Sequence, residues 1–313
     1  MRGRDYFHLP TLPALWTWWL GLGLNAAGIL LLGIPFVVAA YGFTPLDWQL
    51  SAGEGLRGGY AYHLALFASF VPAFLVPLLL WRFLNGLPVR RLVSWTGRVR
   101  WGHVLRAGFV VMVAYSAFCA LEYRIDPDAY AGLQRQTDWT GYAVLLAITL
   151  LLCPVQASSE ELLVRGYANH ALVRTFARLR IGPGAAVWTA YILTSALFAS
   201  LHLGNPEGDG QIGPYMAGTF VFGMGMCVLL HFEGGLESAI GYHIANNLFV
   251  FSLLGYSDPE LPDSALFWVP EIVIGWTDIF WDTLWTAALV AVILWWNRKA
   301  EGKADRNPST DRR

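Results

Sequence analysis

Charged residues are scarce in this sequence: Asp, Glu, Lys and Arg make up only 14% of the 313 residues, whereas soluble domains carry roughly 25%. The charges that are present separate long uncharged stretches, as expected for a chain solvated by hydrocarbon, where no water is available to a charge. Together with 56% hydrophobic residues, this composition excludes an ordinary water-soluble domain. It predicts an all-α fold, a polytopic transmembrane helical bundle.

Cysteine is also rare. Cys119, Cys153 and Cys227 all lie in apolar stretches and show no zinc-ligand or redox spacing, so we expect small packing residues rather than a disulfide framework or a metal finger. Excess positive charge is lacking as well. The formal net charge is −1, and the basic residues do not gather on one face. We therefore expect no nucleic-acid partner.

Long apolar runs, in contrast, are abundant. A spanning helix needs about 20 mostly apolar residues. Eight runs fit, near 15–41, 60–81, 102–121, 140–160, 184–202, 212–231, 237–255 and 279–296. Residues 264–276 are apolar but short and contain Pro270 and Glu271, which favours an interfacial segment over a ninth span.

The distribution of Lys and Arg predicts an orientation. With eight spans, the loops on one side receive nearly all basic residues, and those on the other side receive only Arg57, Arg124 and Arg135. Basic residues in short loops are retained on the cytoplasmic side. We therefore predict an integral membrane protein with both termini cytoplasmic, located in the plasma (inner) membrane if the source is bacterial.

A cluster of charges lies inside an apolar helix. Each such charge costs roughly 2.5 to 3.5 kcal/mol at a helix centre, so it indicates function by default. Glu161 and Arg165 are four residues apart and share a helix face, which predicts an ion pair. Glu160, about 100° further round, has no obvious local partner and suits a general acid or base. A structural charge cluster at a helix end is the alternative.

Two further polar motifs follow. They are Phe-Ala-Ser-Leu-His, ending at His202, and His-Ile-Ala-Asn-Asn, running from His243 to Asn247. His243 and Asn247 are four residues apart and share a helix face. In isolation, a histidine at a helix end and an asparagine in a membrane helix both have ordinary structural roles.

The spacing of these motifs favours a shared site. Gly and Pro predict a helix-breaking turn that begins at Ile181. Glu160 lies 21 residues before Ile181 and His202 lies 21 residues after it. Two antiparallel helices joined there bring this carboxylate and imidazole to a similar height, where they can share one water in a hydrolytic centre. His243 and Asn247 then supply the donors for an oxyanion.

The heights of the two histidines conflict in this arrangement. If Ile181 lies at the cytoplasmic surface, His202 is about 30 Å along its helix, whereas His243 is about 10 Å from its own helix start at Gly235. A single site therefore predicts that the hairpin tip protrudes into the cytoplasm and that the site is a cytoplasm-facing cavity.

The three motifs together resemble the CPBP family of intramembrane proteases (also known as the Abi family), which includes the eukaryotic CAAX prenyl endopeptidase of the Rce1 type. Glu-Glu-x-x-x-Arg, Phe-x-x-x-His and His-x-x-x-Asn occur in order within 140–255. The resemblance implies that Glu160 and His202 activate the hydrolytic water and that His243 and Asn247 form the oxyanion site.

The resemblance also implies a supporting ion pair between Glu161 and Arg165, and it leaves the metal question open. The family has been described both as metalloproteases and as metal-independent glutamate proteases. Glu160, His202 and His243 would be the ligands of a zinc ion with one position open for water. However, His-Glu-x-x-His is absent from the sequence and Asn is an unusual zinc ligand, so we favour water activated directly by the protein.

The chain then divides into four parts. Residues 1–139 form N-terminal transmembrane helices without a matched motif, and 140–255 form the CPBP/Rce1-like protease core. Residues 256–300 hold the interfacial segment and the last transmembrane helix, and 301–313 are expected to be a disordered cytoplasmic tail. Asp278 and Asp282 share a helix face near the start of the last span, which favours an amphipathic interfacial turn over a site.

The resulting functional prediction is an integral membrane endopeptidase. Its partners are the bilayer and a peptide or protein substrate, lipidated or membrane-embedded, in CAAX-type processing or in bacterial peptide maturation or immunity. A catalytically inactive membrane scaffold is the alternative, against which the intact motif set argues. A proton-coupled transporter is a third reading, disfavoured because no inverted repeat is detected.

Overall fold

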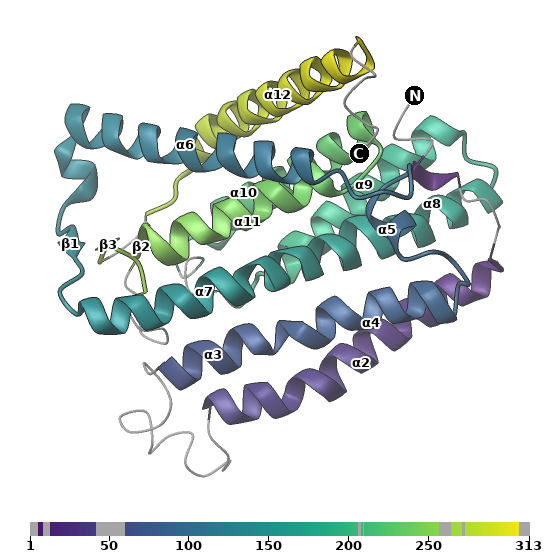
Figure 1. The fold of residues 1–313 in the computed structure, drawn as a ribbon, viewed down its shortest axis with the longest axis horizontal. Coiled ribbons are helices and arrows are strands. Elements are labelled where there is room, and N and C mark those ends of the chain that lie inside the picture. Colours follow the sequence, from purple (N-terminus) through teal and green to yellow (C-terminus); the bar gives the residue numbers. More distant parts are fainter. Residues whose placement is uncertain are drawn as a thin grey trace.

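A computed structural model describes residues 6–8, 13–41, 60–205, 208, 210–256, 264–270 and 273–306. Long helices aligned along one axis make up nearly all of it (Figure 1). The predicted fold class is confirmed. In chain order the elements are α2 (Leu15–Tyr41), α3 (Tyr60–Ala68), α4 (Phe70–Phe83), α5 (Arg90–Val93), α6 (Trp101–Ile125), the 3-10 helix η1 (Pro127–Tyr130), β1 (Gln134–Arg135), α7 (Trp139–Glu160), the π-helix η2 (Glu161–Ala168), α8 (Asn169–Arg178), α9 (Pro183–Ser200), α10 (Ile212–Glu233), α11 (Glu237–Ser252), β2 (Leu254–Tyr256), β3 (Phe267–Val269) and α12 (Trp276–Arg306).

All eight expected spans are helices, but they differ in character. Among the described residues, six helical segments are long and apolar enough to cross a membrane: Leu15–Phe36, His63–Phe83, Trp101–Ile125, Trp139–Arg178, Ile212–Glu233 and Trp276–Gly302. The expected spans 184–202 and 237–255 correspond to α9 and α11, which are only 18 and 16 residues long. Helix α11 is rich in buried polar residues, so it belongs to the interior of the bundle rather than to its lipid-facing surface.

A small sheet lies at one end of the bundle (Figure 1). Strand β3 is central, antiparallel to β1 and parallel to β2. It falls within the segment 264–276 that the sequence predicted to be interfacial. Glu271 of that segment lies outside the described residues.

The opposite end of the bundle gathers the first and last described segments. The Tyr6 hydroxyl donates to the Leu92 carbonyl beside α5. Near the end of α12, a Glu301 carboxylate oxygen lies 3.1 Å from His103 Nε2 on α6. Helix α12 continues to Arg306, so residues 301–306 of the expected tail are helical. Residues 307–313 lie outside the described part of the chain.

Helices α6 and α11 pack backbone to backbone. A Cβ atom at Gly241 would lie only 2.2 Å from the carbonyl oxygen of Val104, so this contact requires glycine. On α6, a Cβ atom at Gly108 would likewise lie 3.3 Å from the carbonyl oxygen of Gly241. Small residues permit such close approach of membrane helices. The contact fixes the position of α11 just before His243.

Helix α7 continues through η2 and α8 without a break, a run of 40 residues. At 1.5 Å per residue this run is about 60 Å long, twice the hydrocarbon thickness of roughly 30 Å. Asp138 begins it by accepting a hydrogen bond from the Gly141 N–H at 2.9 Å, a standard N-terminal cap. Such length is what a hairpin tip protruding beyond the bilayer requires.

Candidate active site

Glu160 is the last residue of α7 and stands where the helix widens into η2. π-helical turns are rare and occur frequently at functional sites. Its side chain is 18% exposed. Oε1 accepts a hydrogen bond from Gln156 Nε2 at 2.5 Å, whereas Oε2 accepts none from any described residue. One oxygen of the carboxylate is therefore held, and the other retains its lone pairs.

His243 links the two adjacent glutamates. Its Nδ1 lies 2.8 Å from Glu161 Oε1, and its Nε2 lies 3.6 Å from Glu160 Oε2. The His243 side chain is nearly buried, at 4% exposed. Since a carboxylate only accepts, Nδ1 carries a proton and donates to Glu161. The ring is thus held by Glu161 with Nε2 turned towards Glu160.

Glu161 and Arg165 form the predicted ion pair within η2. Arg165 Nη1 lies 3.2 Å from Glu161 Oε1, and both side chains are completely buried. The guanidinium also stacks on the Phe198 ring, with its carbon 3.9 Å from the ring centroid. Arg165 thereby balances a carboxylate that already holds His243, and it ties η2 to α9.

His202 follows the end of α9 and is partly buried. Its Nδ1 lies 2.8 Å from the carbonyl oxygen of Phe198, and its ring packs against the Phe198 ring with centroids 4.5 Å apart. A carbonyl can only accept, so Nδ1 carries a proton, and in the neutral form of the ring the lone pair is on Nε2. This is the tautomer that a general base requires.

Asn247 lies one turn after His243 on α11 and is part of a hydrogen-bonded chain. Its Nδ2 donates to Gln156 Oε1 at 2.8 Å, and its Oδ1 accepts from Asn246 Nδ2 at 2.9 Å. Tyr115 on α6 donates in turn to Asn246 Oδ1 at 3.1 Å. One of the two N–H bonds of Asn247 Nδ2 is left for another acceptor.

A cavity of about 940 Å³ unites these residues. Glu160, His202, His243 and Asn247 all line it, together with Gln156. The conflict between the heights of the two histidines is resolved, because Phe198 contacts both rings, 4.5 Å from His202 and 6.0 Å from His243. The structure thus brings the four predicted catalytic residues around one cavity, while their catalytic roles stay predictions.

A metal fits this arrangement poorly. Among the residues that the structure describes, no three His, Cys, Asp or Glu side chains gather as a metal-binding group, and this includes Glu160, His202 and His243. Both ring nitrogens of His243 already face carboxylates. We therefore derive no chemical step through a metal ion.

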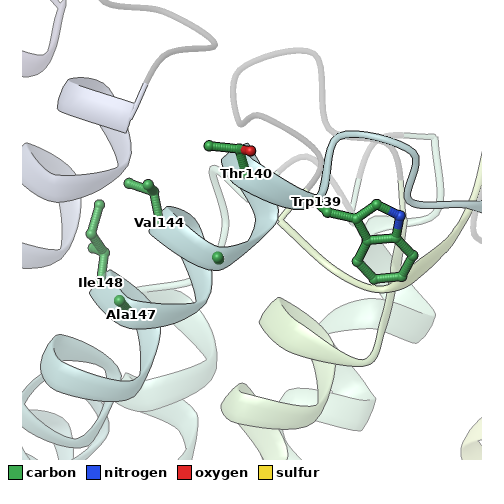
Figure 2. Close-up of a pocket in the computed structure, with 6 residues that line it drawn as sticks. Trp139, Thr140, Val144, Ala147 and Ile148 are labelled. Atoms are coloured by element: carbon green, nitrogen blue, oxygen red, sulfur yellow. The ribbon is translucent and has the colours of Figure 1, made fainter.

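A second hollow, of about 630 Å³, lies on the outer face of α7, far along the helix from Glu160 (Figure 2). It carries no ionisable side chain, and its lining is apolar apart from Thr140. The exposed indole of Trp139 borders it. Such a surface suits contact with lipid and offers no chemistry.

Comparison with known proteins places the same segment in a family. Residues 142–249 match the family described as type II CAAX prenyl endopeptidase Rce1-like. This match supports the resemblance to the CPBP family of CAAX-type membrane proteases that the motifs indicated. The matched segment runs from α7 to α11 and contains all four cavity residues of the predicted site. Helices α2 to α6 and α12 lie outside it.

One curated relative of this chain is a bacterial protein. It is the uncharacterized protein YyaK of Bacillus subtilis (strain 168), which is 26% identical over 232 residues, covering 71% of each chain. No solved structure matches the chain.

Gln156 is a residue of this cavity that the motifs missed. It is buried, and it bridges Glu160 on α7 and Asn247 on α11. A signal was available, because a glutamine inside an otherwise apolar span must find a hydrogen-bond partner. Its position one turn before Glu160 would have indicated the partner.

Proposed function

We propose that this protein is an integral membrane endopeptidase in which Glu160 and His202 activate water for hydrolysis of a peptide bond. The observation that carries the proposal is the state of the Glu160 carboxylate. Gln156 holds one oxygen, and the other accepts no hydrogen bond from a described residue in a cavity shared with His202. A fixed carboxylate with a free oxygen is what a general base needs.

The reaction uses two sets of residues. Glu160 takes a proton from water while His202 Nε2 accepts the other water hydrogen in a hydrogen bond, and the water oxygen bonds to the carbonyl carbon. The carbonyl oxygen becomes an oxyanion, which accepts hydrogen bonds from Asn247 Nδ2 and from Nε2–H of a protonated His243.

Collapse of this intermediate breaks the carbon–nitrogen bond. The proton held by Glu160 passes to the leaving amine. The remaining water hydrogen passes to His202 Nε2 as the product ionises, so that the new carboxylate keeps the water oxygen. Glu161 supports the charge on His243 during these steps, because its carboxylate accepts from Nδ1 at 2.8 Å. Arg165 keeps Glu161 ionised in its buried position.

The substrate class and orientation are part of this proposal. We infer a peptide or protein substrate within reach of the bilayer, with lipidated C-terminal peptides as one class to test. We also infer that both termini are cytoplasmic, since the first and last described segments lie at the same end as the basic α5 region. Reporter fusions at the C-terminus test this: an externally active reporter would overturn it.

The decisive experiment is mass-spectrometric cleavage mapping with the purified protein and its Glu160→Gln variant. The peptide library includes lipidated C-terminal peptides, and each reaction is run with and without a chelator. Glu122→Gln, on α6 and outside the cavity, is the matched control. We expect cleavage by the wild type and the control that resists chelation and disappears with Glu160→Gln. Unaltered cleavage by Glu160→Gln would remove Glu160 from the mechanism, and chelator sensitivity would favour a metal at the histidines. No cleavage by any of the three would favour the scaffold alternative.

A further inference from the structure

Asp282 is a membrane-helix charge that the proposed chemistry does not use. It lies on α12, six residues after Trp276 and so about 9 Å into a segment long and apolar enough to span the membrane. Its side chain is exposed, and it lines the same 940 Å³ cavity as Glu160. A carboxylate at such a position is costly and therefore indicates a function.

The neighbouring acid has a structural explanation, whereas Asp282 has none. Asp278 Oδ2 accepts a hydrogen bond from the Gly275 N–H at 2.7 Å, which caps the start of α12. This fits the predicted interfacial turn. Asp282, by contrast, makes no hydrogen bond or ion pair with a described residue, and it faces the cavity instead of an interface.

Close helix packing holds Asp282 at the cavity. A Cβ at Gly218 of α10 would lie 3.1 Å from Ile279 Cδ1, so the absence of a side chain lets α12 approach α10. The Ile274 N–H donates to Gln211 Oε1 at 2.6 Å and anchors the start of α12. Gly218, Ile274 and Ile279 all line the cavity together with Asp282.

The cavity therefore has two unlike walls. The wall formed by α2, α3 and α4 is entirely apolar, with Ala26, Ile29, Leu30, Leu66, Phe67, Phe70 and Ala73. The wall formed by α11 and α12 contains Asn246 and Asp282. On the same wall, Asn246 accepts from the Tyr115 hydroxyl and donates to Asn247. A cationic group bound at Asp282 would thus lie in the same cavity as the proposed oxyanion donors.

We propose that Asp282 is a specificity-determining residue that binds a Lys or Arg side chain of the substrate within the active-site cavity. An unpaired carboxylate on a largely apolar cavity wall attracts a cation, and no other carboxylate among the described residues of that wall competes for it. It also disfavours substrates that place an acidic residue there. The matched family segment ends before α12, so this selectivity is a property of the surrounding chain. The inference rests on the proposed peptidase function.

The test uses the full-length protein in lipid nanodiscs and a peptide pool in which each position is varied among Lys, Gln and Glu. We compare the wild type with Asp282→Asn and with the matched control Asp278→Asn, which retains an amide oxygen for the cap. We expect the wild type and the control to cleave Lys-containing peptides at least about tenfold faster than their Gln counterparts at one position. Asp282→Asn should cleave the Lys and Gln peptides at similar rates, and Asp282→Glu should regain the preference.

A binding measurement separates this inference from the proposed function. Photoreactive versions of the Lys and Gln peptides are cross-linked to two inactive variants, Glu160→Gln and Glu160→Asn. Each of the two is used with and without the additional substitution Asp282→Asn. Selective capture of the Lys peptide that requires Asp282 supports the subsite even if no peptide is cleaved. Equal handling of Lys and Gln peptides by the wild type, or a preference that survives Asp282→Asn, would overturn it.

Discussion

Gln156 and Glu160 lie one turn apart on α7, and Nε2 of the glutamine donates to Oε1 of the glutamate at 2.5 Å. The other end of the same amide accepts from Asn247 Nδ2 at 2.8 Å. One side chain therefore aligns the proposed base with a proposed oxyanion donor. Its amide cannot flip without breaking both hydrogen bonds, which fixes the relative position of two groups carried on different helices.

We predict that Gln156→Met lowers kcat about tenfold to a hundredfold and leaves KM nearly unchanged. Methionine has a similar volume but cannot donate to Glu160 or accept from Asn247, so the reacting groups lose their alignment while the cavity keeps its shape. Steady-state kinetics on a cleaved peptide measures the two constants. Leu151→Ala, on the exposed face of the same helix, is the control and should retain activity. An increase in KM alone would assign Gln156 to substrate binding instead.

We predict that Arg165→Met lowers the free energy of unfolding by about 3 kcal/mol. The substitution leaves the Glu161 carboxylate fully buried with His243 as its remaining partner, and breaking a buried ion pair by removing one member is strongly destabilising. Thermal unfolding in detergent measures the loss. The double variant Arg165→Met with Glu161→Gln removes the stranded charge and should recover much of the stability. A single variant as stable as the wild type would contradict the supporting role of the pair.

We predict that Gly241→Ala is destabilising by about 1 to 3 kcal/mol and also lowers activity. A Cβ there meets the Val104 carbonyl oxygen at 2.2 Å, and the α6 backbone has to move away. Since His243 lies two residues later, the shift also displaces its ring. Gly23→Ala on α2, where a Cβ meets nothing within 4 Å, is the matched control and should be neutral. Similar melting temperatures for both variants would show that α6 and α11 can separate at no cost.

The predictable part of this site is the part that follows helical periodicity. Glu161 and Arg165 are four residues apart, and their ion pair is present at 3.2 Å. Glu160 and His202 are equally distant from the turn at Ile181, and both line the cavity. The apolar runs likewise predicted every long helix, because a hydrocarbon environment leaves a spanning chain few alternatives.

What could not be predicted depends on contacts between distant segments. No sequence pattern marks a π-helix, so the exact directions of Glu160 and Glu161 were hidden. The strands of the small sheet are two or three residues long, too short for an alternating pattern to register. Asp282 resembled an interfacial residue because it lies four residues after Asp278 and shares its helix face. Its place in the cavity depends on the glycine contact between α10 and α12.

The tautomer of His202 leads to the last prediction. Its Nδ1–H donates to the Phe198 carbonyl at 2.8 Å, which leaves Nε2 as the atom available for catalysis. His202→Asn places an amide nitrogen near the position of Nδ1, so it can keep the hydrogen bond but has no group at the position of Nε2. We predict that cleavage falls about a hundredfold or more while thermal unfolding changes little.

Chemical rescue distinguishes this role from a structural one. His202→Ala removes the ring and leaves space beside Phe198, so free imidazole added to the buffer should restore part of its activity. The same addition should have no effect on Glu160→Gln, whose missing group is a carboxylate. If His202→Asn cleaved as fast as the wild type, or if imidazole failed to stimulate His202→Ala, water activation would rest on Glu160 alone, and the role of His202 would reduce to capping the end of α9.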